Sequence, residues 1–143
     1  SWEQSKLKSE NRRSLLQGIP QAMPALLSAQ RIQEKAASVG FEWKTIEPVF
    51  DKVDEEWQEF KDEYKNQNNE KMREEFGDLL FAMVNLGRFL DITAEDTCRQ
   101  TNNKFIRRFQ YIEKSYNEDP LAMKEATLEE LDHFWEEAKL KGL

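Results

Sequence analysis

The chain has 143 residues, of which 38% are hydrophobic, and a net charge of −7; it therefore fits one domain with a modest core, and broad attraction to nucleic acid is disfavoured. The longest uninterrupted apolar run, Leu79 to Val84, is far too short to cross a bilayer, and the N-terminal residues contain no apolar signal-peptide core. We therefore expect a cytoplasmic protein with neither nucleic acid nor a membrane as a partner.

Glycine and proline are scarce and gather at the predicted breaks. We expect residues 1–23 to form a charged helix end and a linker, because the prolines up to Pro24 restrict the backbone there. A domain at residues 24–143 follows. Its first helix is predicted at about 25–39, with Gly40 as the C-cap.

Four further helices are expected between short polar breaks. Thr45 is the N-cap candidate of the second helix, and Pro48 fits its first turn. Thr93 opens the fourth helix, and Thr127 with Glu130 forms a capping box for the last one. No alternating strand pattern competes, so the fold is predicted to be all-α, a bundle of about five helices. The expected helices after the first are 45–64, 70–90, 93–116 and 127–139.

A short motif recurs near the two ends of the chain. Trp2-Glu3-x-x-Lys6 resembles Trp135-Glu136-x-x-Lys139. Matches this short are weak, and the pattern alone favours chance. The alternative is that residues 1–17 are the end of a preceding, related domain.

Carboxylates are the strongest candidates for chemistry in this sequence. The lone Cys98 excludes an internal disulfide and a Cys-rich zinc site, and the lone His133 excludes the paired Glu-x-x-His sites of di-iron bundles. Two pairs of acids have i, i+3 spacing, which places each pair on one helical face. Two such faces brought together offer four oxygen ligands, which suit Mg²⁺ or Mn²⁺. The pairs are Glu56 with Glu59 and Glu75 with Asp78.

Helical geometry separates these ligand candidates from solvated acids. At about 100° per residue, Glu56 lies roughly 70° and Glu59 roughly 130° from the centre of the core stripe, whereas Glu55 points nearly opposite. Glu75 flanks the next stripe. Asp78 leads into a segment that is apolar on almost every face, where a carboxylate is costly without a cation or donors. The predicted core stripes are Val49, Phe50, Val53, Trp57, Phe60 and Tyr64, and then Met72, Phe76, Leu79, Leu80 and Met83.

Each polar group also has a simpler interpretation. Acids at this spacing often form only a solvated face, although like charges on packed helices repel and would need a compensating cation. On the fourth helix, Lys104 and Arg108 lie one turn apart with Asn102 nearby, a pattern that can grip phosphate oxygens or simply form a solubilising basic patch. That helix is expected to bury Phe105, Phe109, Ile112 and Tyr116.

Taken together, these residues resemble the MazG family of nucleoside triphosphate pyrophosphohydrolases. Glu55-Glu56-Trp57-Gln58-Glu59 followed by Glu75-Phe76-Gly77-Asp78 is similar to its Glu-Glu-x-x-Glu and Glu-x-x-Asp signature. The resemblance covers nearly the whole chain and is closest to the C-terminal of the two domains in bacterial MazG. The four-carboxylate motif alone is shared with related helical pyrophosphatases, so the combination carries the specificity. Further similar segments are Gly77–Phe81, Asn102–Phe109, the linker 19–26 and the loop 40–43.

The resemblance implies a four-helix core completed by dimerisation, so we expect a homodimer. It also favours the preceding-domain origin of residues 1–17. The resemblance places Glu56, Glu59, Glu75 and Asp78 at the Mg²⁺ positions. It places Lys52, Lys71, Lys104 and Arg108 at the triphosphate, and Asn102 with the substrate. Trp135 would lie near the nucleoside or act as a core or interface anchor, with Trp43 a weaker candidate for the nucleoside contact.

The implied reaction is Mg²⁺-dependent hydrolysis of a nucleoside triphosphate to the monophosphate and pyrophosphate, in nucleotide-pool housecleaning. Glu55 or Glu59 would orient the attacking water, and the sequence leaves both open. Two alternatives stay within the superfamily: cleavage of dUTP or dCTP, and cleavage of a phosphoribosylated ATP. A third is a helical module that binds nucleotides without turnover.

Overall fold

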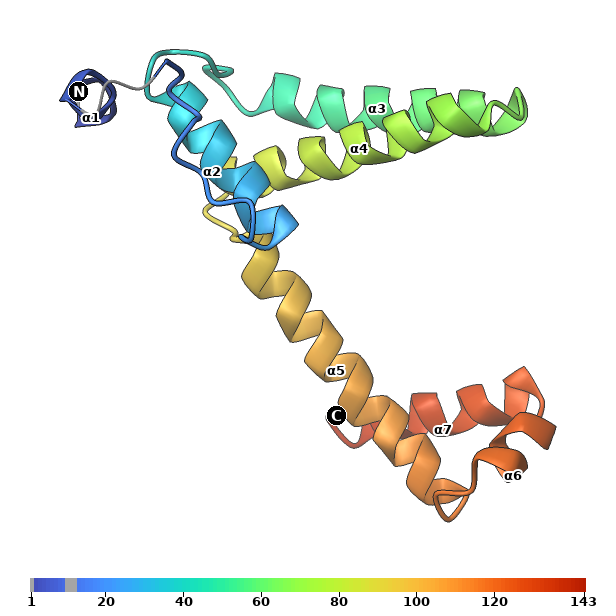
Figure 1. The fold of residues 1–143 in the computed structure, drawn as a ribbon. Coiled ribbons are helices and arrows are strands. Elements are labelled where there is room, and N and C mark those ends of the chain that lie inside the picture. Colours follow the sequence, from blue (N-terminus) through green and yellow to red (C-terminus); the bar gives the residue numbers. More distant parts are fainter. Residues whose placement is uncertain (1, 10–12) are drawn as a thin grey trace. The chain divides into compact units, whose positions relative to one another are not determined.

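The computed structural model describes residues 2–9 and 13–143, and every regular element in them is a helix. The all-α prediction is therefore confirmed. Residues 10–12 of the predicted N-terminal segment, and the Lys6 side chain of the recurring motif, lie outside the described residues. The helices, drawn in Figure 1, are α1 (Trp2–Ser9), α2 (Ala25–Ala37), α3 (Glu47–Lys65), α4 (Asn69–Phe89), α5 (Ala94–Ser115), α6 (Pro120–Glu125) and α7 (Leu128–Leu140).

The chain divides into two compact units, Ser1–Glu95 and Asp96–Leu143. In the first unit, α3 and α4 form a long helical hairpin, and α2 packs on α4 (Figure 1). The turn between the hairpin helices uses Gln67 in the left-handed conformation, and the Asn68 side chain caps α4. The predicted boundary between residues 23 and 24 stays a prediction. No helix in the described part of the chain is long and apolar enough to cross a membrane.

Local chemistry explains some of the helix ends. The prediction of Gly40 as the C-cap of α2 is wrong, because the helix ends at Ala37 with Ser38 as its C-cap. Gly40, with φ +90°, lies in the turn that follows, where glycine adopts this conformation without strain. The capping box of Thr127 and Glu130 is confirmed at the start of α7. The Thr45 cap is wrong: Ile46 occupies the N-cap of α3 and makes no side-chain cap bond. The short helix α6, which Asp119 caps, was not predicted from the sequence.

The predicted core stripes of α3 and α4 are only partly correct. Val49 is 1% exposed, but Trp57 is 47% and Tyr64 68% exposed. The hairpin buries the face of α3 that carries Val49 and Glu56, which are seven residues apart, and leaves most large aromatics outside it. On α4 the fully buried residues are Ala82 and Val84, whereas the predicted core residues Phe76, Leu80 and Met83 are about half exposed.

The second unit packs α5 against α7. Ile112 and Ala138 are buried, and the Tyr111 hydroxyl donates a hydrogen bond to Glu137. The ring of Phe105 lies 5.2 Å from that of Trp135. The predicted stripe on α5 is therefore correct for Ile112 but wrong in part, because Phe105 and Phe109 remain substantially exposed in this unit.

Candidate metal centre

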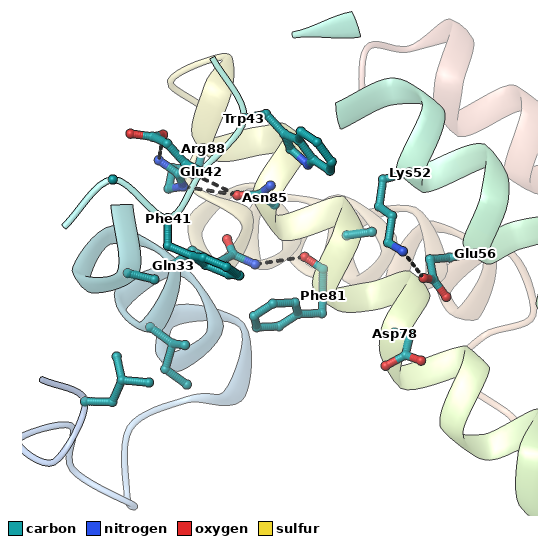
Figure 2. Close-up of a pocket in the computed structure, with 15 residues that line it drawn as sticks. Gln33, Phe41, Glu42, Trp43, Lys52, Glu56, Asp78, Phe81, Asn85 and Arg88 are labelled. Carbon is teal, nitrogen blue, oxygen red and sulfur yellow. Dashed lines mark hydrogen bonds and ion pairs between the residues drawn. The ribbon is translucent and has the colours of Figure 1, made fainter. Parts of the chain in front are cut away.

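Three carboxylates of the first unit converge at the middle of the helical hairpin. Glu56 on α3 and both Glu75 and Asp78 on α4 each offer an oxygen within 4.8 Å of the others. Glu56 is only 5% exposed, Glu75 is half-buried and Asp78 is exposed. Figure 2 shows Glu56 and Asp78 projecting from the two neighbouring helices. The i, i+3 spacing of Glu75 and Asp78 thus places both on the side of α4 that faces α3.

Glu59 is not one of the three carboxylates that meet around one point, but it interacts with Glu75. A hydrogen bond with the Glu59 carboxyl group, partial burial and the negative charge of Glu59 raise the pKa of Glu75 to about 7, and Glu56 adds a smaller contribution. The carboxyl groups are therefore so close that one of them holds a proton near neutral pH. All four predicted acids lie in one cluster.

The donor atoms of this cluster fit a hard divalent cation. The Oε2 atoms of Glu56 and Glu75 are buried and have no hydrogen-bond partner among the described residues. Buried carboxylate oxygens without a donor or cation are costly, and like charges at this separation repel. The set consists of carboxylates alone, which is the ligand chemistry that Mg²⁺ and Mn²⁺ prefer. We call Glu56, Glu59, Glu75 and Asp78 the acidic cluster.

A lysine sits at the edge of the acidic cluster. Lys52 Nζ lies 3.1 Å from Glu55 and 3.1 Å from Glu56. Its hydrogen bonds to Glu56 and then to Glu55 raise the pKa of Lys52, so this side chain is a fixed positive charge. Glu55 is about half exposed and turned to solvent, as the helical geometry predicted. Lys71 is exposed one turn before Glu75 on α4.

The remaining predicted site residues belong to the second unit. Arg108 donates from Nε to the Leu143 carbonyl at 2.8 Å, and its guanidinium lies 5.3 Å from the centre of the Trp135 ring. Trp135 thus has a packing role in this unit, the interpretation that the sequence left open beside nucleoside contact. Lys104 and Asn102 are exposed on the same helix, α5.

A cavity of about 830 Å³ opens beside the acidic cluster in the first unit (Figure 2). Lys52, Glu56 and Asp78 line one part of it. The predicted Trp43 also lines it. Four further polar residues that line it were not predicted from the sequence: Gln33, Glu42, Asn85 and Arg88. The sequence of α4 contains a pattern that could have indicated two of them, because Asn85 and Arg88 are polar residues in an otherwise apolar segment, seven and ten residues after Asp78.

Comparison with known proteins identifies the family of this chain. A family model described as the MazG nucleotide pyrophosphohydrolase domain matches residues 44–112. The nucleoside triphosphate pyrophosphohydrolase/pyrophosphatase MazG of Thermotoga maritima is 41% identical over 140 residues, covering 96% of this chain and 54% of the relative. The chain belongs to the MazG family. The region matched by the MazG model contains the whole acidic cluster together with Lys52, Lys104 and Arg108.

Other relatives show the same MazG similarity. The nucleoside triphosphate pyrophosphohydrolase of Escherichia coli (strain K12) is 41% identical over 143 residues, with 96% of this chain and 54% of the relative covered. The uncharacterized protein YabN of Bacillus subtilis is 42% identical over 142 residues, with 97% of this chain but only 29% of the relative covered. The chain thus spans about half the length of the first two MazG relatives.

Proposed function

We propose that this chain hydrolyses nucleoside triphosphates to nucleoside monophosphates and pyrophosphate with the help of Mg²⁺ or Mn²⁺. The observation that carries the proposal is the meeting of Glu56, Glu75 and Asp78 around one point, with buried oxygens that have no partner. The names of the Thermotoga maritima and Escherichia coli relatives, both nucleoside triphosphate pyrophosphohydrolases, support the same reaction. They favour it over cleavage of dUTP, dCTP or a phosphoribosylated ATP.

The acidic cluster would hold the metal, with Glu56 and Glu75 supplying the buried oxygens and Glu59 and Asp78 completing the set. A divalent cation bound there supplies positive charge to phosphate oxygens and makes a nearby water more acidic. A bound cation would also lower the pKa of Glu75, because its positive charge compensates the repulsion between carboxylates that raises this pKa.

The other groups would act on the substrate and on the attacking water. Water attacks the α-phosphorus, the bond from that phosphorus to the bridging oxygen breaks, and pyrophosphate leaves. Glu55 or Glu59 would accept a hydrogen bond from this water and take up its proton. Lys52, already charged and held at the edge of the cluster, would meet the triphosphate. The further charges expected to stabilise the leaving pyrophosphate are Lys71, Lys104 and Arg108. Asn102 is expected to contact the substrate, and Trp135 or Trp43 the nucleoside.

The test is a metal-dependent assay of all common NTPs and dNTPs, with separation of monophosphate from diphosphate products. We expect monophosphate and pyrophosphate only when Mg²⁺ or Mn²⁺ is present, and loss of turnover in Glu56→Gln and Asp78→Asn at unchanged helicity. Diphosphate with orthophosphate as products would refute the assigned bond cleavage. Full activity of either variant would refute the assigned metal ligands. Retained nucleotide binding without any product would favour the non-catalytic module.

We also infer that the chain acts as a homodimer. Phe50, Trp57 and Tyr64 recur every seven residues on α3 and are 47%, 47% and 68% exposed, which forms an apolar strip that a second copy would cover. Sedimentation of the wild type should give a dimer, and Trp57→Glu should shift it towards the monomer. A wild-type monomer at all concentrations would contradict this inference.

A further inference from the structure

The cavity beside the acidic cluster has a second, polar part that the metal and phosphate chemistry does not use. Asn85 lies two helical turns beyond Asp78 on α4, which is about 10 Å along the helix axis. That is the distance over which a nucleoside extends from its α-phosphate to the edge of its base. The cavity volume of about 830 Å³ lies within the usual range for small-molecule sites.

Gln33 presents an unused acceptor in this part of the cavity. Its side chain, on α2, is among the most buried polar groups of the first unit, with 6% exposure. Gln33 Nε2 donates to the Phe81 carbonyl oxygen at 2.9 Å, which fixes the orientation of the amide. Gln33 Oε1 is buried and has no partner among the described residues. A group that enters here must therefore bring an N–H or O–H donor.

Asn85 presents the complementary donor. Its Oδ1 accepts from Arg88 Nε at 3.2 Å and from Arg88 Nη2 at 3.0 Å. Because a guanidinium offers only donors, the Asn85 oxygen must face Arg88, and its amide N–H groups are turned the other way. Arg88 is in turn held by Glu42 at 3.1 Å. Figure 2 shows Glu42, Arg88 and Asn85 joined in this order.

Aromatic rings line the same part of the cavity without being packed away. Phe41, Trp43 and Phe81 all line it, and all three are substantially exposed. Figure 2 shows Trp43 and Phe81 on either side of the Asn85 and Gln33 amides. Exposed aromatic rings beside buried amides provide both a stacking surface and directional hydrogen bonds, which is how planar heterocycles are bound.

We propose that this part of the cavity binds the nucleobase. Gln33 Oε1 accepts a hydrogen bond from an amino or imino N–H of the base, Asn85 Nδ2 donates to the adjacent ring nitrogen or carbonyl, and Trp43 stacks on the ring. Gln33 is then the residue that determines the preference of the enzyme among the bases of its substrates. This inference rests on the proposed function and extends it to the side chains that recognise the base, Gln33 and Asn85.

The kinetic test compares Gln33→Met with Gln30→Met. Gln30 is on the same helix and also has a buried Oε1 without a partner, but it does not line the cavity. With each of the four NTPs, Gln33→Met should lower kcat/KM at least about tenfold for the best substrate and flatten the preference among bases, whereas Gln30→Met should do neither. Loss with ATP and CTP alone assigns an amino donor, and loss with GTP and UTP alone an imino donor. Ribose 5-triphosphate, which has no base, should be cleaved equally by both variants.

Trp43→Ala keeps the test valid if Gln33→Met does not fold, because Trp43 is half-exposed in a loop. It should lower kcat/KM at least about fivefold for the best NTP and leave ribose 5-triphosphate unaffected. Unchanged kcat/KM and unchanged base preference in folded Gln33→Met and Trp43→Ala would overturn the inference while the proposed reaction stands. Loss of the dimer in Trp43→Ala without a change in nucleotide affinity would assign the ring to subunit contact and would also overturn it.

Equilibrium binding separates failure of the subsite from failure of the reaction. Nucleoside monophosphates are titrated with Mg²⁺ present, and binding is followed by calorimetry. If no triphosphate is cleaved but monophosphates bind to the wild type and at least about tenfold more weakly to Gln33→Met, the subsite stands and the proposed reaction fails. If monophosphates bind equally well to the wild type and Gln33→Met, the subsite is wrong.

Discussion

The neighbouring residues Glu55 and Glu56 offer a matched test of the metal centre. Both carboxylates lie 3.1 Å from Lys52 Nζ, and both lose one negative charge on replacement by glutamine. The two side chains point in different directions. The Glu56 side chain is 7% exposed and belongs to the acidic cluster, whereas the Glu55 side chain is 53% exposed and points to solvent. A general effect of charge on stability would therefore appear in both variants, and a metal effect only in Glu56→Gln.

The expected size of the effect follows from binding linkage. At 100 times its Kd, a metal that binds only the folded protein stabilises it by about 2.7 kcal/mol. With an unfolding entropy of about 2.1 cal/mol/K per residue, this raises Tm by about 9 °C if the whole chain unfolds together. The rise is about 13 °C if only the unit Ser1–Glu95 unfolds. Loss of one partner from a buried charge cluster costs about 3 kcal/mol, roughly a hundredfold in Kd, which leaves a shift of about 1 °C in Glu56→Gln.

The assay is thermal unfolding of chelator-treated protein at pH 8, with and without Mg²⁺ at 100 times the wild-type Kd from calorimetry. Glu55→Gln should keep the wild-type shift, and Glu56→Gln should lose nearly all of it. Equal shifts in the two variants, whether both large or both absent, would refute the assignment of Glu56 to the metal site. Sodium chloride at matched ionic strength serves as a control for general screening by salt.

Three further predictions test the cluster, the core and the basic residues. The pKa of Glu75 in the folded protein is raised to about 7, so its contribution to stability is fully present below the ordinary value near 4.5 and is lost as pH rises through about 7. The Tm of the metal-free wild type should therefore fall between about pH 5 and about pH 8, and the Tm of Glu75→Gln should fall clearly less over the same range. An equal fall in both proteins would show that Glu75 and Glu59 do not repel each other. Val49→Ala should lower the free energy of unfolding in urea by about 2 kcal/mol, because Val49 is 1% exposed, whereas a loss under about 0.5 kcal/mol would show that the site is loosely packed. Lys104→Ala should raise KM or lower kcat about tenfold, the usual cost of a lost charged hydrogen bond, and unchanged kinetics would remove Lys104 from the triphosphate site.

Local spacing in the sequence determined much of this protein. The all-α class and the capping box of Thr127 depend on interactions within a few residues, so they can be predicted without knowledge of the fold. The i, i+3 pairs likewise placed Glu75 and Asp78 together on one side of α4. Family resemblance then supplied the interpretation of these pairs as metal ligands.

Only the tertiary structure decided how each helix is rotated about its own axis. The apolar residues of α3 spread over more than one face. Packing against α4 buries the face that carries Val49 and Glu56 and leaves the face that carries Trp57 exposed. The same packing sets Glu59 against Glu75 and encloses a cavity between Gln33 and Asn85. Such contacts join residues far apart in the chain, and their energies depend on the shape of both partners, which no local pattern of residues contains.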